Sequence, residues 1–152
     1  MIEVDTLHEL LPMVGRTLGA SRWHLVDQAL IDRFADVTGD HAWYHVDAPR
    51  AAAEMPDGRT IAHGLLTLSL VPALTAEIVR VRRHGRALVA GYDRVRFIEP
   101  VRCGDRLQLT LAVEAATIDD KGRVTLVYGC TMALEGSTRP AMVALLRLVL
   151  PA

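Results

Sequence analysis

The residues best suited to chemistry lie close together in the sequence, between positions 38 and 64. This segment is rich in carboxylates and imidazoles, the side chains that most often transfer protons or bind metal ions near neutral pH. The candidates are Asp40, His41, His45, Asp47 and His63. Four interpretations of this cluster compete: a metal site, a nucleophilic triad, an acid–base pair and a purely structural group of polar residues.

The pattern gives little support to the first two interpretations. His41 and His45 would face one ion together only on a helix, and Gly39 is typical of a helix that has just ended. A nucleophilic triad lacks its usual marker, because the chain contains no Gly-x-Ser-x-Gly motif. Neither cysteine, Cys103 or Cys130, lies near a histidine in the sequence.

The other two interpretations remain open on the pattern alone. As an acid–base pair on one short loop, Asp40 and His45 could hold a water molecule between them. They could then take a proton from it and return the proton without a metal. As structural residues, Asp40 would cap backbone amides and His45 would bond a carbonyl group.

Gly64 is a further candidate, because it stands where a long apolar segment begins. Its N–H would be one of the unpaired amides at the positive end of a helix. Glycine also lets a ligand carbonyl approach the backbone closely, which is the geometry that an oxyanion hole needs. The alternative is a glycine required by packing between a helix and a sheet.

Two helices should position these residues. Asp27 is a favourable N-cap and Gly39 a favourable C-terminal stop, so Asp40 should lie in a loop just past a helix end. A second helix is expected from Asp47, with Pro49 in its first turn. On the first helix, helical spacing predicts an apolar face made of Leu30, Ile31, Phe34 and Val37.

Residues 64–79 predict the centre of the fold. Ten of these sixteen residues are Ala, Val, Ile or Leu, and they surround a helix instead of forming one stripe. A membrane span needs about 18–20 apolar residues, and His63, Pro72 and Glu77 interrupt this segment too closely. We therefore expect a buried central helix with a kink at Pro72.

The rest of the chain predicts a sheet. Alternating residues rich in Val, Leu and Thr, separated by turn residues, indicate strands at 88–98, 106–118, 123–134 and 141–150. Residues 5–13 suit a short amphipathic helix, and residues 16–26 suit a further strand. The expected inward positions of that strand are Trp23, Leu25 and Thr17. The fold class is α+β, an antiparallel curved sheet wrapped around a long central apolar helix.

Length and composition limit the partners. A chain of 152 residues indicates a single domain over residues 1–152. Its 17 basic and 18 acidic residues nearly balance, which argues against nucleic acid or an acidic membrane surface as the main partner. Two cysteines are too few for a disulfide framework, and the N-terminus lacks the pattern of a signal peptide. We expect a soluble, cytoplasmic protein.

Three motifs occur in order along the chain. The first is Phe34-x-x-Val37-Thr38-Gly39-Asp40, followed by His45 and Ala51. The second is Ala62-His63-Gly64-Leu65-Leu66, and the third is Asp93-Arg94-Val95-Arg96-Phe97-x-x-Pro100-Val101. Together these motifs resemble the signature of the MaoC-like R-specific enoyl-CoA hydratases, especially their NodN-like branch, and the similarity covers most of the chain.

This resemblance implies a hot-dog fold acting as a homodimer. It implies reversible addition of water to a trans-2-enoyl thioester, carried by coenzyme A or an acyl carrier protein, to give the (R)-3-hydroxyacyl thioester. Neither a metal nor a redox cofactor is required. Asp40 and His45 match the catalytic pair. Gly64 matches the amide that holds the thioester oxygen, with His63 and Ala62 beside it in the substrate-binding segment.

The chain departs from the family between the two catalytic positions. The family usually has Asn-Pro followed by Leu, Ile or Val there, whereas this chain has Ala42-Trp43-Tyr44. Trp43 is similar to the NodN-like branch, but Ala42 lacks the amide of Asn or Gln. A supporting serine of some hydratases lies near the position that Pro72 occupies here.

Two functions of other classes remain as alternatives. A hot-dog acyl-CoA thioesterase would need a carboxylate on the central helix, and Glu77 is the available one, although it comes late. A non-catalytic acyl-thioester-binding protein would keep the fold without needing Asp40 and His45 together. A basic run could meet the nucleotide phosphates of coenzyme A or form a solvated charged face. It comprises Arg80, Arg82, Arg83 and Arg86.

Overall fold

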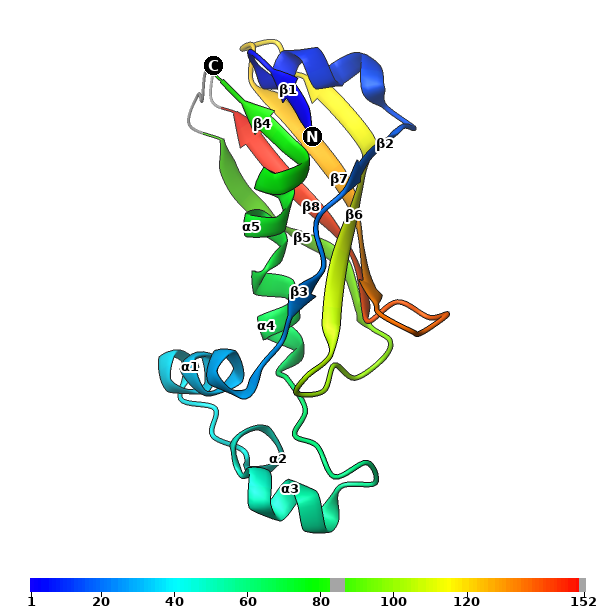
Figure 1. Cartoon of the computed structure of the whole chain (residues 1–152). Helices are drawn as coiled ribbons and strands as arrows, with labels where there is room; N and C mark the ends of the chain where they lie inside the picture. Colours follow the sequence, from blue (N-terminus) through cyan, green and yellow to red (C-terminus); the bar gives the residue numbers. More distant parts are fainter. Residues whose placement is uncertain (83–86, 151–152) are drawn as a thin grey trace.

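A curved antiparallel sheet and the helices along it form the framework of the protein. The computed structural model describes residues 1–82 and 87–150. Its main sheet has six strands, and all of them pair in antiparallel fashion. Five strands follow one another in the order β2 (Thr17–Ala20), β6 (Arg106–Ile118), β7 (Val124–Leu134), β8 (Met142–Leu150) and β5 (Leu88–Phe97). The sixth, β3 (His24–Leu25), also pairs with β6. The sheet curves around α4 (Gly64–Ser69) and α5 (Val71–Ile78), as Figure 1 shows. This is the predicted hot-dog arrangement.

The four long strands agree with the prediction to within one residue at each end. Alternation explains this accuracy, because every second side chain of a strand points to the same face. On β6, the positions that face the helices are fully buried: Leu107, Leu109, Leu111 and Val113. The turn between β6 and β7 forms because the Asp119 carboxylate accepts hydrogen bonds from the backbone N–H groups of Lys121 and Arg123.

The expected strand at 16–26 is interrupted, and its inward positions were predicted wrongly. Leu18 and Val26 are the buried residues, whereas Leu25 and Thr17 are exposed and Trp23 is half-buried. The prediction chose the wrong phase of the alternation, because the buried residues Leu18 and Val26 each lie one position after an expected one. A change of register beside Gly19 and a break between β2 and β3 interrupt the alternation, so this segment gives no consistent signal of which face is inward.

The central helix is divided near Pro72, as predicted. Leu70 separates α4 from α5, and Pro72 lies in the first turn of α5, where its missing N–H costs no helical hydrogen bond. The prediction that the helix is covered on all sides is wrong for the single chain. One face packs on the sheet, but the other exposes Leu65 (59%), Pro72, Ala73 and Ala76.

Three further helices lie beyond one end of the sheet, in the lower part of Figure 1: α1 (Gln28–Thr38), α2 (Trp43–Val46) and α3 (Ala48–Glu54). Asp27 caps α1 by accepting from the Leu30 N–H at 2.8 Å, and Gly39 ends it with φ at 77°. Asp47 caps α3, as expected. The inward face of α1 is centred on Ile31 and Ala35, so the prediction that Val37 faces inward is wrong, since Val37 is 86% exposed.

The N-terminal region contains an expected helix and an unexpected pair of strands. The helix is a short 3-10 helix, η1 (Leu7–Met13), which buries Leu7 and Leu10 in the core. The strands β1 (Ile2–Val4) and β4 (Val79–Val81) pair in parallel at the end of α5. Segments of three residues show too little alternation to be recognised from the sequence.

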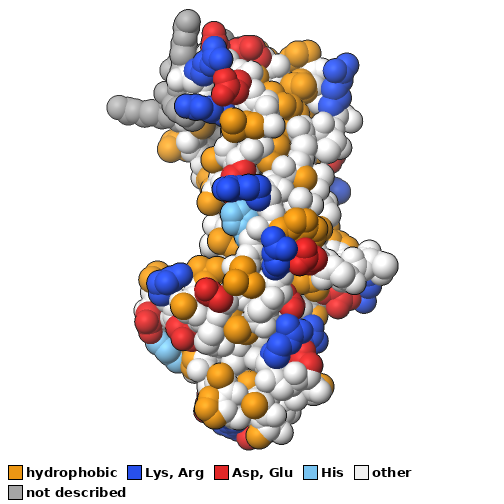
Figure 2. Space-filling model, viewed as in Figure 1, with side chains coloured by type: hydrophobic (Ala, Val, Ile, Leu, Met, Phe, Trp, Pro, Cys, Tyr) orange, Lys and Arg blue, Asp and Glu red, His pale blue; other side chains and the backbone are white. Residues whose placement is uncertain are grey.

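Charged groups of both signs are interspersed on the face shown in Figure 2. In the basic run, Arg82 pairs with Glu3 at 2.8 Å and with Asp5 at 3.8 Å, and Arg80 lies 3.6 Å from Glu3. These pairs favour the interpretation of a solvated charged face. Arg83 and Arg86 fall outside the described residues. Within residues 1–82 and 87–150, no helix combines the length and apolarity needed to cross a membrane.

Candidate active site

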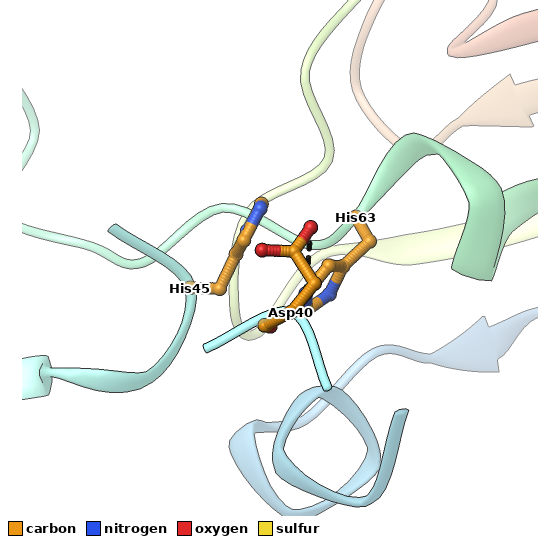
Figure 3. A group of neighbouring side chains, drawn as sticks. All are labelled: Asp40, His45 and His63. Atoms are coloured by element: carbon orange, nitrogen blue, oxygen red, sulfur yellow. Dashed lines mark hydrogen bonds and ion pairs between the residues drawn. The ribbon is translucent and has the colours of Figure 1, made fainter. Parts of the chain in front are cut away.

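Three of the predicted side chains converge at one end of the central helix. Asp40 follows α1, His45 lies on α2, and His63 directly precedes α4. One carboxylate oxygen of Asp40 and one ring nitrogen from each histidine lie within 4.8 Å of one another, and Figure 3 shows the three side chains meeting from separate segments. Together with Gly64 they line a hollow of about 190 Å³. The site is therefore assembled by bringing the loop after α1 against the start of α4.

The His45 ring is held in its neutral form, with Nε2 as the nitrogen that can accept a hydrogen bond. Its side chain is buried, and its Nδ1 contacts the carbonyl oxygen of Ile61, which only accepts hydrogen bonds. The hydrogen of the neutral ring therefore sits on Nδ1, and Nε2 carries a free lone pair. Burial lowers the pKa of His45, and the nearby His63 lowers it further, against opposing effects of the Ile61 carbonyl and Asp40.

Asp40 keeps its carboxylate largely free. Its side chain is 57% exposed, and Oδ1 accepts only a long hydrogen bond of 3.4 Å from the Ala42 N–H among the described residues. The backbone is what fixes the residue, because the Asp40 carbonyl accepts from His63 Nε2 at 2.9 Å. The structural interpretation requires the Asp40 side chain to cap backbone amides. The long hydrogen bond from the Ala42 N–H makes it a weak cap.

His63 packs under both members of the pair. It is nearly fully buried, and its ring stacks on the ring of His45 with centroids 3.7 Å apart. The Phe34 ring packs against it at a tilt, with centroids 5.1 Å apart. Its Nε2 donates to Asp40, and its buried Nδ1 has no hydrogen-bond partner in the part of the chain that the structure describes. His63 thus holds the Asp40 backbone beside His45 and forms a wall of the hollow.

The ring geometry disfavours a metal shared by the two histidines. An imidazole binds a metal in its ring plane, about 2.0–2.1 Å from the nitrogen. The planes of His45 and His63 are only 24° apart and stacked, so no point at that distance lies in both. His41, the other histidine considered as a ligand, is exposed and pairs with Asp36 at 3.0 Å. The arrangement suits acid–base chemistry better.

Gly64 contributes to the lining of two hollows. It lines the one that contains Asp40 and His45, and also a second of about 340 Å³ with Ala62, Thr67 and Phe97. A Cβ atom on Gly64 would meet the Phe97 ring at 3.1 Å, so close packing against Phe97 also favours a glycine here. The oxyanion interpretation rests instead on the Gly64 N–H, which donates to no acceptor within residues 1–82 and 87–150. The Ala62 N–H is already bound to the Val101 carbonyl at 2.7 Å.

Glu77, the carboxylate that a thioesterase would use, is engaged elsewhere. It accepts hydrogen bonds from the backbone and guanidinium of Arg22, at 3.0 and 3.2 Å, and lies 2.8 Å from His24. Hydrogen bonding to Arg22 lowers the pKa of Glu77, which keeps it ionised. It lies on α5 and does not line the hollow beside Gly64.

Sequence reasoning did not single out two residues that contact this site. Gln28 Nε2 donates to the His45 carbonyl at 2.8 Å, and the Thr60 hydroxyl donates to Gln28 Oε1 at 2.6 Å. A polar residue in the first turn of a helix is common and gives no signal by itself. The hydrogen bonds of Gln28 to His45 and Thr60 become visible only when α1 is placed against α2 and the segment before α4.

Comparison with known proteins identifies the family. A family model for the MaoC like domain matches residues 10–132. Nodulation protein N of Rhizobium meliloti is 39% identical over 140 residues, which cover 91% of this chain and 87% of that protein. The 3-hydroxyacyl-thioester dehydratase Z of Mycobacterium tuberculosis is also 39% identical over 140 residues, with 92% of each chain covered.

A solved structure shows the same fold. The (R)-hydratase from A. caviae involved in PHA biosynthesis superimposes with a TM-score of 0.70 at 25% identity, over 91% of this chain and 96% of that one. The family match spans most of the chain, and the alignments with the two relatives cover most of the length of each relative. The chain therefore belongs to the MaoC-like domain family.

Proposed function

We propose that the protein is a hydro-lyase that adds water reversibly to a trans-2-enoyl thioester and forms the (R)-3-hydroxyacyl thioester. The observation that carries this proposal is the convergence of the Asp40 carboxylate and the His45 imidazole, whose Nδ1 contacts the Ile61 carbonyl, at a hollow that Gly64 also lines. The names of the relatives, a 3-hydroxyacyl-thioester dehydratase and an (R)-hydratase, support the same reaction class.

The two acceptors determine how water is held. The Asp40 carboxylate and the His45 Nε2 both accept hydrogen bonds in the resting state, so a water molecule between them donates both of its hydrogens. Its oxygen lone pair is then left free to attack C3 of the enoyl group. Fixing the attacking oxygen in this way supplies orientation, which contributes strongly to the rate.

Proton and electron movements balance without a further reactant. As the C3–O bond forms, the electrons of the C2–C3 double bond move to the thioester oxygen, and Asp40 accepts a proton from the water. The enolate oxygen is stabilised by the Gly64 N–H. The same acid–base pair then returns the proton to C2, which restores the thioester carbonyl and the resting site. The reverse sequence dehydrates the 3-hydroxyacyl thioester.

The two hollows that Gly64 lines are where we place the two arms of the substrate. A thioester carbonyl bound at the Gly64 N–H would direct its acyl chain and its pantetheine arm away from each other, and each hollow has apolar residues in its lining. We propose coenzyme A or an acyl carrier protein as the carrier.

We further propose that the protein is a homodimer. The apolar residues of α4 and α5 surround the helices, yet one chain covers only the face that packs on the sheet. An exposed apolar helix face is normally covered by a partner, and a two-fold pair would cover both copies at once. Light scattering should give twice the mass of the chain. A monomer with full activity would contradict the proposed dimer.

A paired assay tests the reaction class. The absorbance of the conjugated enoyl thioester is followed with crotonyl-CoA, together with a free-thiol reagent in a parallel sample. Loss of the conjugated band without thiol release is the expected result. Thiol release would indicate a thioesterase, and no change in either signal would indicate a binding protein; both outcomes contradict the proposal.

A further inference from the structure

The side chain of Gln28 connects the two halves of the site. Gln28 lies in the first turn of α1, and its Nε2 donates to the His45 carbonyl on α2 at 2.8 Å. Its Oε1 accepts from the hydroxyl of Thr60, in the segment that leads to His63 and Gly64, at 2.6 Å. One amide thus bonds both to the helix that carries His45 and to the segment that begins α4.

The hydrogen bonds fix the amide in one orientation. Nε2 has two hydrogens, and both are used, because it also donates to Asp32 Oδ1 at 2.8 Å. A reversed amide would place Oε1 against the His45 carbonyl and the Asp32 carboxylate, which are acceptors. Thr60 is 2% exposed, so its hydroxyl needs the partner that Gln28 Oε1 supplies.

These bonds act on the contact that sets the tautomer of His45. The His45 Nδ1 donates to the carbonyl of Ile61, the neighbour of Thr60, and the Ile61 N–H donates to the Tyr44 carbonyl at 2.9 Å. Gln28 adds a brace on each side, at the His45 carbonyl and at Thr60. Loss of this brace would leave the ring held against its partner mainly by the contacts between α2 and the Ile61 backbone.

We propose that Gln28, with Thr60, is a positioning residue that keeps the Ile61 carbonyl against His45 Nδ1 and so keeps His45 Nε2 available as an acceptor. The kinetic consequence rests on the proposed hydro-lyase function; the structural consequence, one fixed tautomer of His45, does not. Gln28 touches neither water nor substrate in this account. Its effect passes entirely through His45.

The kinetic test uses Gln28→Met, which keeps the length of the side chain and removes its hydrogen bonds. We expect kcat to fall about tenfold while KM changes less than about twofold, because orientation and not binding is lost. Gln108→Met is the matched control. Gln108 is also half-buried, and its Nε2 donates to a backbone carbonyl, that of Ser21, at 2.8 Å in the sheet. This control should retain nearly wild-type kcat.

A double mutant separates positioning from a general structural role. In a His45→Gln background, Gln28→Met should change the residual kcat by less than about twofold, because the residue through which it acts is gone. An equal tenfold loss in both backgrounds would overturn the proposal. Thr60→Val should reproduce part of the loss and Thr60→Ser, which keeps the hydroxyl, should restore it, so the test does not depend on one variant folding.

An NMR measurement tests the inference without any activity. With ¹⁵N-labelled histidine, the ring signals of His45 are assigned by their disappearance in His45→Gln. The wild-type protein should show His45 as the Nδ1–H tautomer, and Gln28→Met should show a mixture of tautomers. An unchanged tautomer in Gln28→Met would overturn the inference. Absence of hydration by the wild type would refute the proposed function instead and leave this result standing.

Discussion

Asp40→Asn should lower kcat by about 10²-fold or more while leaving the melting temperature unchanged. Asparagine keeps the shape of the side chain but cannot accept the proton that water must lose. Stability should be preserved, because the Asp40 side chain is mostly exposed and its hydrogen bond to the Ala42 N–H is long, at 3.4 Å. Steady-state hydration of crotonyl-CoA, with thermal unfolding of the same samples, provides the measurement.

Asp36→Asn is the matched control for this substitution. Asp36 is an exposed carboxylate of α1 at the same end of the molecule, and it pairs with His41 instead of facing the hollow. It should keep nearly full activity. Near-normal turnover of Asp40→Asn with an unchanged melting temperature would show that Asp40 is only a cap.

His45→Gln should cause a loss of similar size, and it should also change the dependence on pH. In the wild type, protonation of His45 Nε2 removes the acceptor, so kcat/KM falls as the pH decreases through the pKa of His45. Because burial lowers that pKa from the ordinary value of 6.5, the decline should begin below the range of a free imidazole. The glutamine side chain of the variant does not titrate, so this acid limb should disappear from its pH profile.

The double mutant Asp40→Asn/His45→Gln tests whether the two side chains share one water. If they act as a unit, the combined loss should be much smaller than the product of the single losses. Multiplicative losses would show that the two residues act independently. A pH profile of His45→Gln that keeps the wild-type acid limb would show that another group titrates there.

Local signals made much of this fold predictable. Asp27 and Gly39 marked both ends of α1 because each satisfies backbone groups that a helix leaves unpaired. The long strands were recognisable because alternation over about ten residues outweighs any single misfit. The candidate site segment also has a local signal, since Asp40 and His45 lie near each other in the chain and follow a recognisable helix end.

Features that depend on distant segments were not predictable in the same way. The pairing of β1 with β4 joins the start of the chain to the end of α5. The stacking of His63 on His45 requires α2 and α4 to be placed first, and so does the brace made by Gln28. The exposure of Val37 depends on which side of α1 meets the rest of the protein. In each case the deciding contact is made by tertiary packing.

The handedness of the product tests the central claim most directly. Asp40, His45 and Gly64 line one hollow in a fixed arrangement, so a water held by the pair should attack only one face of an enoyl group bound at the Gly64 N–H. Chiral chromatography of the hydrolysed product from crotonyl-CoA should give 3-hydroxybutyrate as the R enantiomer alone. An S product would contradict the proposed orientation of the substrate, and a racemate would contradict attack by a water held between Asp40 and His45.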